Sequence, residues 1–228
     1  MKGAPRALLA IACIVAIIAG APSPASAIID GTTSGSITGQ AQVWINGGAS
    51  FNCTGTIIGK HYVLTAAHCL HPSRLVVKVG DRRLGYGQRI EVDGTAVAPK
   101  GYDMAVLHLA ADITQTNLIV RYSSDPNPLK AGLTMAVRGW GYTTRTGPVS
   151  PSLKVCSLRL DSASGSELVL SGLNGYPSYG DSGAGVWYGS RVHAVYVDGD
   201  DSNGARAIPT GFLAGWIHSV SGISGVSG

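Results

Sequence analysis

Three short segments of this 228-residue chain carry side chains that could act as a base, an acid and a nucleophile. His68 follows Leu64-Thr65-Ala66-Ala67, whose small alanines leave room around the imidazole ring. Asp103 heads an apolar run, and Ser182 is framed by small residues in Gly180-Asp181-Ser182-Gly183. Taken singly, each could be ordinary: a core histidine, a turn aspartate and a glycine-rich turn. Together they supply what nucleophilic catalysis needs, because a serine hydroxyl is a poor nucleophile without a base within hydrogen-bond reach.

The glycine-rich segment 180–185 could belong to other kinds of site, and its details exclude two of them. A phosphate-binding loop ends in a lysine followed by a helix, and neither is indicated here. The nucleophile elbow of α/β-hydrolases has glycine two residues after its serine, whereas Ala184 stands at that place. That elbow also comes before its acid and its histidine in the chain. In this sequence His68 and Asp103 precede Ser182, which indicates a different fold.

The first 27 residues have the pattern of a secretory signal peptide. Lys2 and Arg6 precede an apolar run over residues 7–20, which is shorter than the roughly 20 residues that a membrane-spanning helix needs. The segment ends in Ala25-Ser26-Ala27, and small residues at these places suit cleavage by a signal peptidase. We therefore expect a secreted, extracellular protein without a membrane anchor, whose mature chain begins at Ile28.

Removal of residues 1–27 changes the meaning of the four cysteines, because Cys13 leaves with that segment. Cys53 and Cys69 lie 16 positions apart, a spacing compatible with a disulfide that closes a hairpin beside His68. Outside the cell, such a bridge typically stabilises a protein by about 2–4 kcal/mol. Cys156 is left over, and it is either buried as a small apolar residue or free for an intermolecular bond.

The mature chain has the pattern of an all-β protein. Short apolar or alternating runs, such as residues 75–79 and 192–197, recur between Gly, Pro, Asn and Ser residues. Short strands at such spacing predict a sandwich or a barrel rather than βαβ units. Helical periodicity is convincing in one place, around residues 212–220.

A candidate linker divides the mature chain into halves of similar length. Residues 123–128 contain two prolines, which resist both a helix and a central strand. We therefore predict a first domain over residues 28–125 and a second domain over residues 126–228.

The composition excludes several classes of protein. The chain has 32 glycines, too many for a coiled coil, and its hydrophobic content of 45% is too high for a disordered protein. Its formal net charge of +4 is modest and no basic cluster stands out, so we expect no binding to nucleic acid. The cysteines and histidines lack the paired spacing of a zinc site, so we expect neither a metal nor another cofactor.

Five short motifs, taken together, resemble one protein family. They are Ile28-Ile29-Asp30-Gly31, Thr65-Ala66-Ala67-His68-Cys69, Asp103-Met104-Ala105-Val106-Leu107, Gly139-Trp140-Gly141 and Gly180-Asp181-Ser182-Gly183. In this order, and over essentially the whole mature chain, they are similar to the chymotrypsin/trypsin-like serine proteases, in particular to secreted bacterial members. The resemblance implies two six-stranded antiparallel β-barrels, a short C-terminal helix and an active site between the barrels. It also implies a serine endopeptidase that works through an acyl-enzyme.

The resemblance assigns a role to each residue of the proposed triad. His68 would be the general base, Asp103 would orient the imidazole ring, and Ser182 would be the nucleophile. The main-chain N–H groups of Gly180 and Ser182 would form the oxyanion hole. The family also places an N-terminal amine beside Asp181, and here signal-peptide cleavage would itself release the amine of Ile28. The resemblance therefore implies an enzyme that is active on secretion without a separate activation step.

Four positions depart from the family pattern. Ala184 replaces a second glycine after the serine, Ser178 stands where many members have a cysteine, and Tyr196 aligns with a serine that supports the triad aspartate. Tyr176 falls at the base of the specificity pocket, where trypsin-like members have aspartate. Strict trypsin specificity is therefore not expected from Tyr176. Asp198 lies with Asp200 and Asp201 on the loop expected to rim the pocket, where the three carboxylates either attract basic substrates or form a solvated turn. Asp198 is the second candidate for the specificity pocket.

Two other functions fit the same residues. An esterase would use the same triad, and a secreted binding protein could keep the fold without catalysis. As partners we expect a protein or peptide substrate, with a protein protease inhibitor as a further candidate, and we expect the chain to be a monomer.

Overall fold

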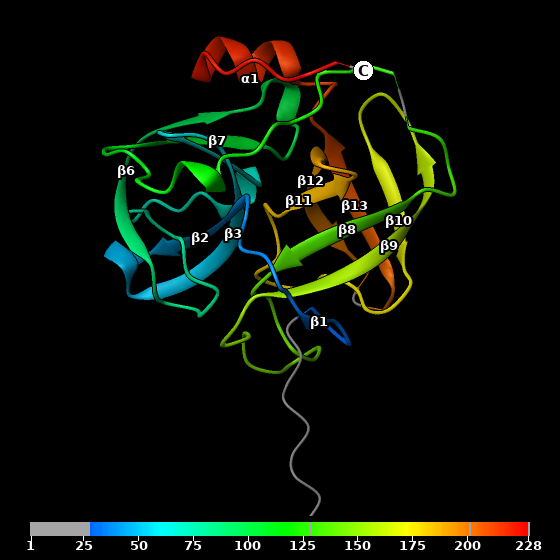
Figure 1. Cartoon of the computed structure of the whole chain (residues 1–228), viewed down its shortest axis with the longest axis horizontal. Helices are drawn as coiled ribbons and strands as arrows, with labels where there is room; N and C mark the ends of the chain where they lie inside the picture. Colours follow the sequence, from blue (N-terminus) through cyan, green and yellow to red (C-terminus); the bar gives the residue numbers. More distant parts are fainter. Residues whose placement is uncertain (1–27, 128, 201, 228) are drawn as a thin grey trace, which may run out of the picture.

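The computed structural model describes residues 28–127, 129–200 and 202–227, and most of these residues lie in β-strands (Figure 1). The predicted signal peptide, residues 1–27, lies outside this range. One closed barrel has the strand order β2-β3-β4-β7-β6-β5, with antiparallel neighbours. Its strands are β2 (Gln40–Ile45), β3 (Ser50–Gly59), β4 (Tyr62–Thr65), β5 (Val76–Val79), β6 (Gln88–Val97) and β7 (Ala105–Leu109).

A second antiparallel sheet follows, in the order β9-β10-β13-β12-β11-β8, and the pairing of β8 with β9 closes it into another barrel. Its strands are β8 (Thr134–Gly139), β9 (Lys154–Ala163), β10 (Leu168–Gly172), β11 (Gly185–Tyr188), β12 (Arg191–Gly199) and β13 (Gly204–Pro209). Short 3₁₀ turns occupy Asn46–Gly48, Ala67–Cys69, Pro99–Gly101 and Thr116–Leu118. The prediction of two six-stranded antiparallel barrels is thus confirmed.

The strands follow from alternating patterns in the sequence. In β9, for example, Cys156, Leu158 and Leu160 are buried while the residues between them are partly or fully exposed. This period of two turns one face of the strand toward the barrel interior. The core of the first barrel is continuous with apolar residues of the second, including Trp187 and Val197. The two barrels therefore share one apolar interface.

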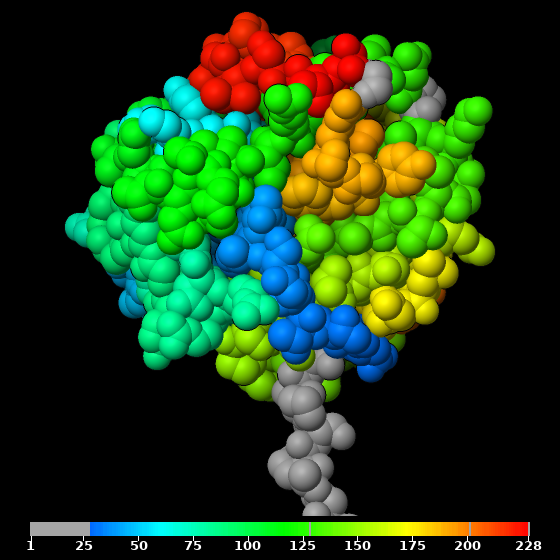
Figure 2. Space-filling model, in the orientation of Figure 1, coloured from blue at the N-terminus to red at the C-terminus, as the bar shows by residue number. Residues whose placement is uncertain are grey.

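Two short elements cross from one barrel to the other. The strand β1 (Thr32–Thr33) precedes the first barrel in the chain but pairs with β9 of the second. Figure 2 shows this N-terminal segment on the surface at the seam between the barrels. The helix α1 (Ala214–Ser221) follows the second barrel but packs on the first, where Ile217 is fully buried and the helix contacts β7 (Figure 1). The division of the chain at residues 125 and 126 remains a proposal, and these two elements connect its halves.

The helix α1 confirms the short C-terminal helix that the periodicity predicted. Gly222 ends it in a left-handed conformation with φ of 70°, and its N–H donates to the carbonyl of His218. With eight residues α1 is the longest helix described, and none of the helices described is long and apolar enough to cross a membrane.

Of the three cysteines described, two form the bridge that the spacing predicted, Cys53–Cys69. Cys156 is a free thiol, 1% exposed, in the core of the second barrel. Burial raises the pKa of this thiol, so that it stays protonated. Of the two alternatives, the structure therefore supports the buried apolar residue.

Candidate active site

His68 lies in the 3₁₀ turn Ala67–Cys69, directly after β4. The disulfide to Cys53 ties this turn to β3, and the side-chain amide of Asn52 donates to the carbonyl of Cys69 at 2.9 Å. Because the turn is held by both a covalent and a hydrogen bond, the backbone position of the histidine is fixed. Its side chain is 48% exposed, so the ring is open to a substrate.

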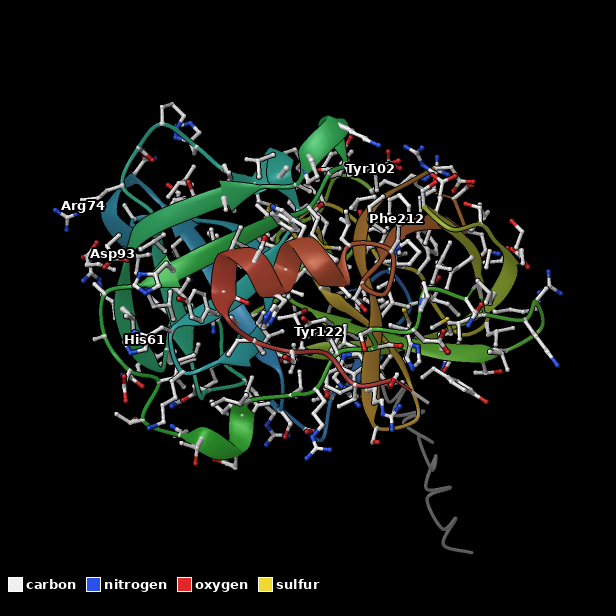
Figure 3. The ribbon with its side chains drawn as sticks, turned by 90° about the horizontal axis from the view of Figure 1, so that it is seen from above. His61, Arg74, Asp93, Tyr102, Tyr122 and Phe212 are labelled. Carbon is white, nitrogen blue, oxygen red and sulfur yellow. A yellow bond between two sulfur atoms is a disulfide. The ribbon has the colours of Figure 1, made fainter. Side chains whose placement is uncertain are left out.

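Asp103 stands just before β7, the last strand of the first barrel in chain order. Met104, the next residue, is fully buried and anchors the strand. On the other side, the ring of Tyr102 packs edge-on against Phe212, with 4.9 Å between the ring centroids (Figure 3). Since Phe212 belongs to the segment that leads into α1, the aspartate is braced from both halves of the chain.

The carboxylate of Asp103 holds His68 at two points. Its Oδ2 accepts a hydrogen bond from His68 Nδ1 at 2.6 Å, and its Oδ1 accepts one from the His68 main-chain N–H at 2.9 Å. A carboxylate can only accept, so the proton of the neutral ring lies on Nδ1 and leaves Nε2 as an acceptor. The sequence prediction that these residues act together agrees with this geometry.

The same pair shifts both pKa values. The hydrogen bond that the His68 ring donates to Asp103 is the largest effect on His68 and raises its pKa, although burial acts against it; the charges of Asp103 and Asp198 add to the rise. Burial raises the pKa of Asp103, but the hydrogen bonds from the His68 ring and amide outweigh it and bring the pKa below its ordinary value. Asp103 is therefore ionised at neutral pH.

Ser182 lies on a tight turn that both barrels hold. The first barrel contributes Thr54, whose hydroxyl donates to the carbonyl of Gly180 at 2.9 Å and whose N–H donates to the carbonyl of Ser182 at 3.0 Å. The second contributes Tyr196, whose carbonyl accepts from the N–H of Gly183 at 2.8 Å. Gly183 has φ of 89°, and a Cβ there would stand 2.1 Å from the main-chain carbonyl oxygen of Thr54, so glycine is required.

The hydroxyl of Ser182 has a main-chain acceptor in this structure. It donates to the carbonyl of Val197 at 3.2 Å and, within the part of the chain described, not to His68. Rotation about the Cα–Cβ bond exchanges such an acceptor, and catalytic hydrogen bonds are often loose before substrate binds. The N–H groups of Gly180 and Ser182 donate to none of the described residues. Both amides are thus available to an added acceptor.

Asp181, beside the serine, is fully buried. Its carboxylate accepts hydrogen bonds from the N–H groups of Gly141 at 2.8 Å and Ser178 at 3.0 Å. Burial nevertheless raises its pKa to about 7. The motif Gly139-Trp140-Gly141 makes room for this carboxylate, since a Cβ on Gly139 or Gly141 would stand 2.1 or 2.4 Å from its oxygens.

The segment that begins at Ile28 lies against the second barrel. The Ile28 side chain is fully buried in the core that also contains Ala184 and Cys156. Ile29 pairs with Tyr176 in an isolated bridge, and the Tyr176 N–H donates to the Ile29 carbonyl at 3.0 Å. The sequence predicts Tyr176 at the base of the specificity pocket, and in the structure its backbone lies against the N-terminal segment.

A pocket of about 340 Å³ opens beside the serine. Residues from three parts of the chain line it: His68, Ser178, Tyr179, Ser182, Tyr196, Val197, Asp198 and Gly199. His68 and Ser182, which are 114 positions apart in the sequence, thus face one cavity. Tyr176 is not among the residues that line it, whereas Asp198 is.

The charge of Asp198 is balanced from outside the pocket. Arg206, on the neighbouring strand β13, contacts both of its carboxylate oxygens, one of them from Nε at 3.3 Å. Glu167 contacts the same guanidinium at 3.4 Å. Asp200, by contrast, caps the following loop by accepting from three main-chain N–H groups, including that of Gly204 at 2.8 Å. Asp201 lies outside the described residues.

Two further departures from the family pattern have structural explanations. The hydroxyl of Tyr196 donates to the carbonyl of Pro177 at 3.3 Å, and its ring lies in the core of the second barrel. The hydroxyl of Ser178 is buried in the pocket wall without a hydrogen-bond partner among the described residues. Sequence reasoning missed the contributions of Thr54 and Arg206, because neither lies in a motif.

One cluster resembles a metal site in its composition. Ligand atoms of Cys53, His68 and Cys69 lie within 4.8 Å of one another. Both sulfurs are joined in the disulfide, however, and a bonded pair offers no thiolate to an ion. The cluster is therefore a structural brace for the histidine.

Comparison with known proteins agrees with the fold and the motifs. Trypsin iota of Drosophila melanogaster is 33% identical over 138 residues, 52% of this chain and 51% of that protein. Chymotrypsin-like elastase family member 1 of Macaca fascicularis is 30% identical over 156 residues, 58% of this chain and 57% of that protein. The chain thus spans about half the length of the curated relatives it matches.

The fold also matches a solved structure, that of neuropsin, a serine protease expressed in the limbic system of mouse brain. The TM-score is 0.75 at 19% sequence identity, over 85% of this chain and 99% of that one, so this likeness supports the fold. A family model described as Trypsin matches residues 28–214, most of the chain described. The chain belongs to the trypsin family, the chymotrypsin/trypsin-like serine proteases.

Proposed function

We propose that this chain is a secreted serine endopeptidase that hydrolyses peptide bonds through an acyl-enzyme. The observation that carries the proposal is the pair of hydrogen bonds by which His68 is oriented on Asp103. His68 lines the same pocket as Ser182. A histidine oriented in this way presents Nε2 as a base beside a serine hydroxyl. Family membership supports proteolysis as the reaction.

The reaction follows from these positions. Ser182 Oγ attacks the carbonyl carbon of the scissile bond while its proton passes to His68 Nε2. The imidazolium then gives this proton to the leaving amine as the C–N bond breaks, and Asp103 stabilises the charge without taking a proton. Water enters, loses a proton to His68 and releases the acyl group from Ser182.

The oxyanion formed in each step needs hydrogen-bond donors. The N–H groups of Gly180 and Ser182 are the proposed donors, which fits their lack of an acceptor among the described residues. Loss of one such donor typically costs about 3 kcal/mol of transition-state stabilisation. The bonds from Thr54 to this turn hold it before substrate arrives.

Asp181 is the proposed partner of the free amine of Ile28. A fully buried carboxylate with two amide donors gains from a cation, which would lower its pKa from about 7. If the signal peptide ends at Ala27, secretion alone produces the active enzyme. N-terminal sequencing of active, secreted protein tests this: a start before Ile28 would contradict it.

The pocket indicates which side chain precedes the scissile bond. Because Arg206 balances Asp198, the pocket wall carries little net charge and does not select strongly for lysine or arginine. Tyr179 and Val197 add apolar surface. We infer a preference for uncharged side chains.

The decisive experiment is active-site titration. The purified, processed protein should give a burst of product from an activated ester and should be labelled by a sulfonyl fluoride, whereas Ser182→Ala should do neither. Labelling that persists in Ser182→Ala would place the nucleophile elsewhere. A burst with ester turnover but no peptide turnover would indicate an esterase, and no burst would indicate a binding protein.

A further inference from the structure

The chain contains three Asn-Gly pairs, and the asparagine of each pair is exposed to water. The pairs are Asn46-Gly47, Asn174-Gly175 and Asn203-Gly204. In such a pair the main-chain nitrogen of the glycine can attack the side-chain carbonyl carbon of the asparagine, because glycine has no Cβ that blocks the approach. The nitrogen must give up its proton in this reaction. The environment of each glycine N–H therefore decides which pair reacts first.

Two of the three glycine N–H groups are held by acceptors. Gly47, in the turn between β2 and β3, donates to the carbonyl of Arg74 at 2.9 Å. Gly204, the first residue of β13, donates to Oδ1 of Asp200 at 2.8 Å. The attack on the side chain would have to break these hydrogen bonds, and their loss raises the barrier. These two pairs should therefore react slowly in the folded protein.

The pair Asn174-Gly175 differs from both. The N–H of Gly175 donates to none of the described residues. Oδ1 of Asn174 accepts a hydrogen bond from the N–H of Ser157 on β9 at 2.7 Å. Negative charge develops on this oxygen when the carbonyl carbon is attacked, and a donor that is already in place stabilises the charge. This turn thus combines a free nucleophilic nitrogen with a fixed donor for the oxyanion.

We propose that Asn174 is a site of spontaneous covalent modification in the folded protein. The Gly175 nitrogen forms a bond to Cγ of Asn174, the bond from Cγ to Nδ2 breaks, and the proton of the Gly175 N–H leaves with the ammonia. A succinimide ring remains. Water then opens the ring at either of its carbonyl carbons, which yields aspartate or isoaspartate. Both products weigh one mass unit more than asparagine and carry a negative charge at neutral pH.

The modification also affects the segment that begins at Ile28. Gly175 packs against the backbone of this segment: a Cβ on Gly175 would stand 2.6 Å from the Ile29 carbonyl oxygen and 2.8 Å from the Gly31 nitrogen. Isoaspartate leads the main chain through its own Cβ and Cγ and so lengthens it at this close contact, which displaces the segment. The effect on activity rests on the proposed function, in which the amine of Ile28 pairs with Asp181. Activity falls as isoaspartate accumulates.

Peptide mapping of aged protein tests the modification. The processed, folded protein is kept at mildly alkaline pH and body temperature, and its peptides are analysed by mass spectrometry over several weeks. The peptide with Asn174 should gain one mass unit at least about fivefold faster than the peptides with Asn46 and Asn203, the ratio that a hydrogen bond of about 1 kcal/mol gives. In protein unfolded in urea, where no acceptor holds the glycines, the three rates should lie close together.

Two variants connect the modification to its effect. Asn174→Gln should stop the change at this position, because its longer side chain would have to close a larger ring, and Asn203→Gln is the matched control that should leave the rate at Asn174 unchanged. The burst of the unmodified sequence should fall with its isoaspartate fraction, whereas the burst of Asn174→Gln should persist over the same time.

Equal rates at the three asparagines of the folded protein, or a faster change at Asn46 or Asn203, would overturn the assignment. A burst that survives full conversion to isoaspartate would overturn the effect on the N-terminal segment. Fresh protein without a burst would overturn the proposed function, and the peptide map would still decide the modification.

Discussion

Removal of the Arg206 guanidinium should give the pocket a preference for basic side chains. Arg206→Gln leaves the carboxylate of Asp198 in the wall beside Ser182 without its counter-charge. The two side chains are 48% and 53% exposed, so water screens the pair considerably. A positively charged substrate side chain could then pair with the Asp198 carboxylate in place of the guanidinium.

The magnitude follows from Coulomb's law. At about 6 Å, a charge pair gains roughly 0.7 kcal/mol in bulk water and roughly 3 kcal/mol at an effective dielectric of about 20. Because both groups are half exposed, the lower part of this range applies, and measured exposed pairs reach about 1 kcal/mol. We therefore expect the ratio of kcat/KM for arginine over leucine substrates to rise about fivefold.

The assay compares peptide anilides that differ in the residue before the scissile bond, at low and high salt. The gain should shrink at about 1 M salt, where the Debye length falls to about 3 Å. Arg159→Gln is the matched control, since Arg159 pairs with Asp161 on β9 at 2.8 Å and neither lines the pocket. The double variant that adds Asp198→Asn should lose the gain.

Two results would refute this reasoning. If Arg206→Gln left the arginine-to-leucine ratio unchanged, Arg206 would not mask the pocket charge. If Asp198→Asn in the double variant kept the gain, the added preference would have another source. A second readout does not depend on the choice of substrate. Because the charge of Asp198 already raises the pKa of His68, the acid-side midpoint of the kcat/KM profile should move to higher pH in Arg206→Gln.

Three other predictions follow from the same geometry. Thr54→Val removes the hydroxyl bond to Gly180 and should lower kcat about fivefold with little change in KM, for a loss near 1 kcal/mol; an unchanged kcat in steady-state assays would contradict this. Because the bond to Asp103 raises the pKa of His68, kcat/KM should fall with decreasing pH around a midpoint above 6.5, and a midpoint at or below 6.5 would count against the pair. At alkaline pH, activity should fall as the amine of Ile28 loses its proton. The pKa of this amine should lie above the value near 8 of a free amine, because an ion pair with a carboxylate raises it. Circular dichroism and activity followed together from pH 7 to 11 would show the loss, and full activity at pH 11 would argue against the pairing.

The sequence predicted the elements whose signals are local. The alternation in β9 and the short runs elsewhere predicted strands, and the spacing of Cys53 and Cys69 was compatible with the bridge that the structure shows. His68 and Asp103 were predicted to work together, and the structure shows them in contact. These features can be predicted without knowledge of the tertiary structure. Each depends either on residues close in the chain or on the requirement that a serine nucleophile has a base.

Other contacts had no local signal. Arg206 reaches Asp198 because β12 and β13 pair with an irregular register, which no motif announces. Tyr176 was expected at the pocket base by counting back from Ser182; its backbone pairs with Ile29, a contact that the sequence did not predict, and its place at the pocket base stays a prediction. The exchange of β1 and α1 between barrels was equally hidden, since apolar periodicity shows that a face is buried but not against which partner.

The crossing of β1 and α1 has a consequence for how the molecule comes apart. Each half of the chain lends a segment to the opposite barrel, so neither half can loosen without exposing apolar surface on both. Melting should then be one cooperative transition, with the same midpoint whether secondary structure or tryptophan emission is followed. Fragments cut between residues 125 and 126 should be poorly folded apart and should regain structure when mixed. The two barrels should therefore fold and unfold as one unit, although each has the outline of a domain.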